Sequence, residues 1–188
     1  MKSAITPWAG SLMELFLRAL RDEAAGVRSN AAFAMGQLME NCGSDLSTHY
    51  PEVFKAIYPL FTISPGESAS TRDNAAGAVA RLIIRNMAAV PLDRALPAIM
   101  GSLPIKNDYT ENAPVFRALC QLYKTQPQIL RPYHDRMLHI LASVLGPQGS
   151  GQVEEETRAE LIRLLTALKA EDPRKVALLG LSHFVPTS

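Results

Sequence analysis

Val27-Arg28-Ser29-Asn30-Ala31-Ala32-Phe33-Ala34-Met35-Gly36-Gln37-Leu38 is a segment that recurs forty-four positions further along the chain. The second copy is Thr71-Arg72-Asp73-Asn74-Ala75-Ala76-Gly77-Ala78-Val79-Ala80-Arg81-Leu82, and half of its residues are identical to those of the first. Alanine-rich helices resemble one another by accident, so the informative part of the match is Arg-x-Asn. Asparagine is a poor residue inside a helix, and chance does not favour it twice at one offset. A helical self-similarity with a period of about 40–47 residues is typical of HEAT and armadillo arrays. We therefore interpret the rest of the chain as repeats of this unit.

The composition is that of a folded protein with no strong electrostatic field. Of 188 residues, 47% are hydrophobic and 20% are charged, and the net charge is +1. This balance favours a folded core over disorder, and it offers no overall attraction to nucleic acid or to an anionic membrane. No run approaches the ~18 apolar residues of a membrane span, and the first residues do not form a signal peptide. We expect an intracellular chain in a reducing compartment.

The helical periodicity predicts an all-α fold with no sheet. Prolines lie early or inside the segments that we assign as outer helices, and Pro59 is expected to kink one of them. Ser70 and Asp73 form a candidate capping box for the second inner helix. We predict a HEAT-repeat solenoid of about four helical hairpins plus a terminal helix, as one array over residues 1–188. The expected inner helices are residues 27–42, 71–88, 109–124 and 154–169, and the terminal helix is residues 173–181.

No catalytic or metal-binding pattern is present in the sequence. The four histidines lack the spacing of a zinc-hydrolase helix, and there is no nucleophile elbow, Walker loop or dinucleotide fingerprint. The glycine-rich stretch 146–151 lacks the lysine of a phosphate loop, and Glu154, Glu155 and Glu156 follow it directly. Cys42 and Cys120 are too few for a disulfide scaffold and have no partner pattern for zinc, so we expect buried thiols. We therefore expect neither an enzyme nor a bound cofactor or metal.

The polar residues of the inner helices have two interpretations. Carboxylates in the first turn of a helix favour the positive end of its dipole, which accounts for residues 154–156. The recurring arginines and asparagines can bridge to the next repeat and satisfy loop carbonyls. The alternative is a track for an extended basic peptide, in which asparagines bond its backbone and carboxylates pair its cations. The candidate residues for this track are Asn30, Phe33, Glu40, Asp73, Asn74, Glu111, Asn112, Glu156 and Glu160.

Residues 27–36 and 71–77, together with Leu103-Pro104-Ile105-Lys106-Asn107-Asp108-Tyr109, resemble the C-terminal HEAT repeats of the importin-β family of nuclear transport receptors. The resemblance covers roughly residues 20–145. Since these receptors are several times longer, it implies a C-terminal fragment. It further implies shuttling between cytoplasm and nucleus with basic protein cargo, such as a histone tail or a ribosomal protein. The GTPase Ran and the nucleoporins would be engaged through the remainder of the receptor. The open alternative is a structural HEAT scaffold that joins protein subunits.

Overall fold

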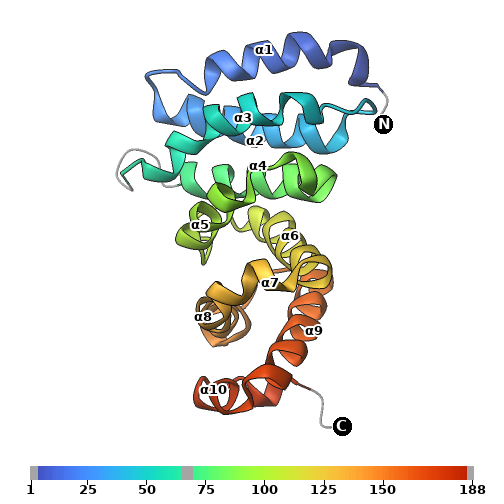
Figure 1. The fold of residues 1–188 in the computed structure, drawn as a ribbon. Coiled ribbons are helices and arrows are strands. Elements are labelled where there is room, and N and C mark those ends of the chain that lie inside the picture. The colour runs from blue at the N-terminus through green and yellow to red at the C-terminus, as the bar shows by residue number, and fades with distance from the viewer. Residues whose placement is uncertain (1–3, 65–69, 186–188) are drawn as a thin grey trace. The chain divides into compact units, whose positions relative to one another are not determined.

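The computed structural model describes residues 4–64 and 70–185, and these residues form helices and turns with no strand among them. The all-α prediction is therefore confirmed for the described chain. The fold divides into two compact units, residues 1–115 and 116–188 (Figure 1). The single array over residues 1–188 stays a prediction. The α-helices are α1 (Ala9–Ala19), α2 (Ala25–Asn41), α3 (Tyr50–Ile57), α4 (Thr71–Asn86), α5 (Leu92–Ser102), α6 (Asn112–Thr125), α7 (Pro127–Leu130), α8 (His134–Leu145), α9 (Glu155–Glu171) and α10 (Pro173–Leu178).

The first unit is organised around the pairing of α2 with α4. These helices make the most extensive contact in the chain, while α1 covers α2 and the helices α3 and α5 lie against α4 (Figure 1). Small side chains allow the close approach: a Cβ atom added to Gly36 would lie 2.8 Å from the Cα atom of Ala78. Ala31 and Ala75 are buried at equivalent positions of the two helices. The repeated motif therefore forms the packing surface between successive inner helices, as HEAT stacking requires.

Two local predictions are wrong in detail. Pro59 does not kink a continuous α-helix; instead α3 ends at Ile57 and the chain continues as a 3₁₀ helix, Tyr58–Thr62. Proline lacks the N–H that the α-helical ladder would need, and a tighter turn accommodates it. The helical spacing of apolar residues predicts that Val27 lies in the core stripe of α2, but its side chain is 40% exposed.

The boundaries of the inner helices agree with the predictions to within a few residues. The third inner helix differs most, because residues Tyr109–Glu111 form a 3₁₀ turn and α6 begins only at Asn112. The predicted capping box at the start of α4 is absent: the Ser70 side chain makes no cap hydrogen bond. The carboxylate of Asp73 is occupied elsewhere, as described below.

In the second unit α9 packs against α8 and α10. Buried leucines along α9, among them Leu161, Leu165 and Leu168, supply its core face. The helix starts after the loop at residues 146–151, in which Gly151 adopts a φ of 80°. Glu155 and Glu156 lie in the first turn, where carboxylates suit the positive end of the helix. None of the described helices has the length and apolarity to cross a membrane.

Candidate functional site

Asn74 joins α4 to α2 and is almost fully buried, at 4% exposure. Its side-chain N–H group donates to the carbonyl oxygen of Ser29 (3.2 Å) and to the Ser29 hydroxyl (3.0 Å). The hydroxyls of Ser29 and Ser70 lie 3.1 Å apart and extend this polar contact. Asn74, the second copy of the repeated asparagine, therefore joins consecutive inner helices through hydrogen bonds.

Asp73 holds the segment that follows α5. Its carboxylate accepts hydrogen bonds from the backbone N–H groups of Lys106 (3.3 Å), Asn107 (2.8 Å) and Asp108 (3.1 Å). Ser29, the equivalent residue in the first copy of the motif, also binds the repeat that follows it. Position 29 and position 73 thus serve the same purpose, and the carboxylate in the second copy suits a loop that presents several amides.

Arg81 lies between two carboxylates from different repeats. Its guanidinium donates to Glu111 (2.5 Å) and to Glu40 (3.1 Å), and its own side chain is 5% exposed. The Glu111 side chain is completely buried. Gly77 makes room for it, because a Cβ atom at Gly77 would lie 1.3 Å from a Glu111 carboxylate oxygen. A buried ion pair of this kind is costly to break, since removal of one partner leaves an uncompensated charge.

The burial of Glu111 also affects its ionisation. Removal from water raises the pKa of the Glu111 carboxyl, and the hydrogen bond and charge of Arg81 oppose that shift. Glu40 adds a second negative charge that also raises the pKa of Glu111. One guanidinium therefore serves two carboxylates, of which Glu111 is inaccessible to a ligand and Glu40 is partly accessible.

The structure places four residues of the predicted peptide track inside the fold. Asp73, Asn74, Glu111 and Asn112 are buried, and the first three have the internal partners described above. A bound peptide would have to displace the contacts between repeats to reach them. Sequence alone could not show this, because burial depends on contacts with the neighbouring repeats.

Three other predicted residues lie together on the accessible side of α2. Asn30 is exposed, Phe33 is 38% exposed, and the Glu40 side chain is 23% exposed. They share one face because helix positions separated by three, seven and ten residues project in similar directions. The guanidinium carbon of Arg81 lies 5.6 Å from the centre of the Phe33 ring and supports it from α4. We call Asn30, Phe33 and Glu40 the α2 face.

The last two predicted residues, Glu156 and Glu160, belong to α9. Glu156 is exposed and Glu160 is half-buried. The Glu160 backbone carbonyl, rather than its carboxylate, is the group that contacts α6: the Cys120 thiol donates to it at 4.0 Å. These two carboxylates remain accessible on the second unit, and we describe them independently of the α2 face.

The recurring arginines satisfy carbonyl groups of the loops that precede their helices. Arg28 donates to the carbonyls of Asp22 and Glu23, both at 2.8 Å, and Arg72 donates to that of Ile63 at 3.1 Å. This is the structural alternative that the sequence left open. Arg-x-Asn is thus a folding signature of the repeat, and only the exposed Asn30 is available for another role.

A third copy of the motif escaped the sequence analysis. Glu111-Asn112-Ala113 corresponds to Ser29-Asn30-Ala31 and to Asp73-Asn74-Ala75, and it lies at the start of the next inner helix. The signal was weak because the spacing shortens to thirty-eight residues and Pro114 replaces an alanine. The roles of Gly77 and Arg81 were not predicted either, because their contacts with Glu111 are visible only in three dimensions.

Histidine, cysteine and acidic side chains do not gather into a metal-binding group anywhere in residues 4–64 and 70–185. Cys42 and Cys120 are both buried free thiols, as predicted. Burial raises the pKa of Cys120 to about 11, so its thiol is protonated at neutral pH.

Comparison with known proteins agrees with this architecture. A HEAT repeat model matches residues 12–42, which include most of α1 and α2. Over 88% of its length the chain is 38% identical to "Probable importin subunit beta-4" of Schizosaccharomyces pombe. It is 29% identical over the same share to "Importin-4" of Homo sapiens and 26% identical to that of Mus musculus. The chain spans 15% of the length of each of these relatives.

Proposed function

The chain belongs to the importin family of HEAT-repeat proteins, and on that premise we propose that it is a cargo-binding segment of a nuclear import receptor. The observation that carries the proposal is similarity to importin-4-type proteins along nearly the whole chain. In this proposal the segment shuttles between cytoplasm and nucleus as part of a longer receptor, whose other repeats engage Ran and nucleoporins.

The α2 face is the surface that we assign to the cargo. Asn30 has both a donor and an acceptor, which suit the backbone of an extended peptide. Phe33 presents an aromatic ring to the aliphatic stem and cation of a lysine or arginine. Glu40 keeps part of its carboxylate accessible beside Arg81 and adds charge selectivity. A Lys/Arg-rich segment, such as a histone tail or a ribosomal protein extension, fits these groups.

Glu156 and Glu160 supply a second acidic element on α9. Exposed carboxylates contribute little energy singly, but they raise the rate of encounter with a basic chain. Salt screens this contribution. We therefore expect cargo binding to weaken steadily between low and physiological ionic strength.

A labelled histone tail tests the proposal. Fluorescence anisotropy is measured against the chain at several salt concentrations, with an acidic peptide of equal length as the control. We expect saturable binding of the tail, weaker at higher salt, and no comparable binding of the acidic peptide. Equal binding of both peptides, or of neither, would overturn the basic-cargo role and favour a HEAT scaffold, since a scaffold has no need to prefer basic segments.

A further inference from the structure

One side of α2 is exposed where the matching side of α4 is buried. The residues that occupy the same positions of the repeated motif on these two sides are the pairs Val27/Thr71, Asn30/Asn74 and Ala34/Ala78. The three residues of α4 are at most 4% exposed, whereas Val27 is 40% exposed, Asn30 is exposed and Ala34 is half-buried. Two pairs are identical and the third is similar in shape, so the two sides differ chiefly in what covers them.

The contact between α2 and α4 shows what covers this side in the second copy. Asn74 donates to the carbonyl oxygen and to the hydroxyl of Ser29, at 3.2 and 3.0 Å. Seven residues further along α2, Gly36 makes room for Ala78, because a Cβ atom at Gly36 would lie 2.8 Å from the Ala78 Cα atom. The covering helix therefore presents a serine to the asparagine and a glycine to the alanine.

The helix α1 adds large apolar side chains to the exposed side of α2. Trp8 is 66% exposed and Leu15 is 49% exposed, and their separation by seven residues places them on one side of the chain at α1. A different side, with Leu20 and Arg21, lines a groove with Ala56 of α3. In the first unit α1 lies at one end and α5 at the other (Figure 1). We call the exposed set at this end the α1–α2 edge: Trp8, Leu15, Val27, Asn30 and Ala34.

A second copy of this chain does not supply the covering helix. The serine and the glycine that α2 would present to it, Ser29 and Gly36, already contact α4. A further HEAT repeat can supply the helix, because the importin relatives are long enough to contain many more repeats: the chain spans 15% of their length.

We propose that the α1–α2 edge receives the inner helix of a further HEAT repeat, recognised by a serine that faces Asn30 and a glycine seven residues later that faces Ala34. The outer helix of that repeat covers Trp8 and Leu15. Asn30 belongs also to the α2 face, so the docked helix excludes cargo from that residue and leaves Phe33 and Glu40 to bind it.

The test adds such a repeat to the intact chain. A second copy of residues 4–44 is joined ahead of residue 1, so that its own Ser29 and Gly36 can meet the α1–α2 edge. Trp8→Phe and Cys42→Ala in the added copy leave the original Trp8 and Cys42 as reporters. Cys42 is buried at the C-terminal end of α2. Its modification by a thiol reagent requires local opening, which a docked repeat suppresses.

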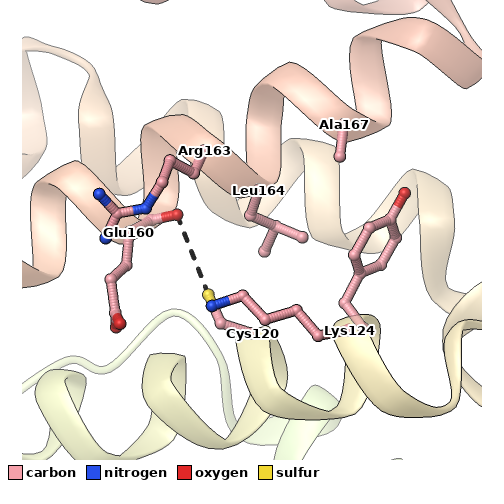
Figure 2. Close-up of a pocket in the computed structure, with 7 residues that line it drawn as sticks. Cys120, Lys124, Glu160, Arg163, Leu164 and Ala167 are labelled. Carbon is pink, nitrogen blue, oxygen red and sulfur yellow. Dashed lines mark hydrogen bonds between the residues drawn. The ribbon is translucent and has the colours of Figure 1, made fainter.

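We expect Cys42 to be modified at least tenfold more slowly in the extended chain, and the fluorescence of Trp8 to move to shorter wavelength. Cys120 is the internal control, because it lies in the second unit, where its thiol donates to the Glu160 carbonyl oxygen at 4.0 Å (Figure 2). Its rate should stay unchanged. An unchanged rate at Cys42, or an added copy that stays unfolded beside a folded chain, would overturn the proposal.

Two substitutions test the recognition itself. Gly36→Leu confined to the added copy keeps its length and should abolish the protection of Cys42, because the leucine side chain holds the helix away from Ala34. Protection that survives this change would contradict the proposed contact. Asn30→Ala should leave the Cys42 rate of the original chain unchanged and should raise that of the extended chain about threefold or more, the loss of one to two hydrogen bonds. An equal effect in both chains would also contradict it.

The inference does not rest on the proposed function. Failure of the histone tail to bind the original chain would overturn the cargo role alone. Unchanged modification of Cys42 in the extended chain would overturn the docking of a further repeat alone.

Discussion

Two helices with one motif meet different environments in this chain. In α4 the motif is covered from both sides: Asn74 bonds to α2, Asp73 holds the segment after α5, and Gly77 admits Glu111. In α2 the equivalent Asn30 and Phe33 are exposed, while Ser29 and Gly36 contact the next repeat. The difference teaches that one residue type at one repeat position acts as an internal bond or as a surface group, depending on whether a neighbouring helix covers it.

Among the equivalent positions of the two copies, we expect positions 33 and 77 to differ most in the loss of stability that a substitution to alanine causes. Gly77→Ala should destabilise the fold by about 3–5 kcal/mol, because the added methyl group would displace Glu111 from Arg81 and strand buried charges. Phe33→Ala should cost less than about 1 kcal/mol, the scale of an exposed aromatic contact with a cation. Urea denaturation measures both. Equal costs would mean that the two copies are not in different environments.

Substitutions of Asp73 and Ser29 by alanine should differ less in the loss of stability that they cause. Asp73→Ala removes a charged acceptor from backbone amides of residues 106–108 and should cost about 1.5–3 kcal/mol. Ser29→Ala should cost about 0.5–1.5 kcal/mol, since neutral hydrogen bonds contribute less. Hydrogen exchange of the amides of Asn107 and Asp108 checks the mechanism. Protection that survives in Asp73→Ala would show that the carboxylate is not their principal partner.

Ala31 and Ala75 should respond alike, because both are buried at the contact between inner helices. We expect Ala31→Leu and Ala75→Leu each to cost about 1–3 kcal/mol through overpacking. Differential scanning calorimetry gives the two melting temperatures. If one variant melts as the wild type does, that alanine lies outside the helix contact and the aligned repeat is incorrect there.

The smallest effect concerns Tyr50, at the start of α3, whose buried hydroxyl has no hydrogen-bond partner among the described residues. Burial raises its pKa from 10.0 to about 12. The fold therefore favours the neutral phenol, and this stability is complete below pH 10 and is lost as the pH rises towards 12. At pH 7, Tyr50→Phe should be as stable as the wild type or more stable by up to about 1 kcal/mol. Above pH 10, the variant should lose less stability than the wild type does.

Tyr123 provides the comparison for that experiment. Its pKa is also raised to about 12, by burial and by the Glu171 carboxylate that accepts its hydrogen bond. Tyr123→Phe should lower stability at pH 7, because the hydrogen bond to the Glu171 carboxylate is lost. Urea midpoints at pH 7, 10 and 11 distinguish the two tyrosines. A loss of stability at pH 7 in Tyr50→Phe would indicate a hydrogen bond that the buried hydroxyl makes in solution.

The sequence predicted the parts of the fold that depend on local pattern. Apolar spacing located the inner helices because it is a property of each single helix, and the repeated Arg-x-Asn indicated the period of the repeat. The change at Pro59 from an α-helix to a 3₁₀ helix could not be predicted from the sequence, since a kink and a tighter turn both accommodate proline. The burial of the candidate site residues could not be predicted from the sequence either. Asn30 and Asn74 are identical in type and offset, and their exposure is decided by contacts between segments that are distant in sequence.

We propose that the repeated asparagine binds cargo at position 30 in α2, whereas at position 74 in α4 it joins consecutive inner helices. Asn30→Ala and Asn74→Ala, each titrated with the labelled histone tail and each melted, test it most directly. We predict that Asn30→Ala weakens tail binding about threefold or more, the loss of one to two hydrogen bonds, at an unchanged melting temperature. Asn74→Ala should melt earlier and bind the tail normally below its transition. Unchanged affinity in Asn30→Ala, together with weakened affinity in Asn74→Ala, would contradict the account.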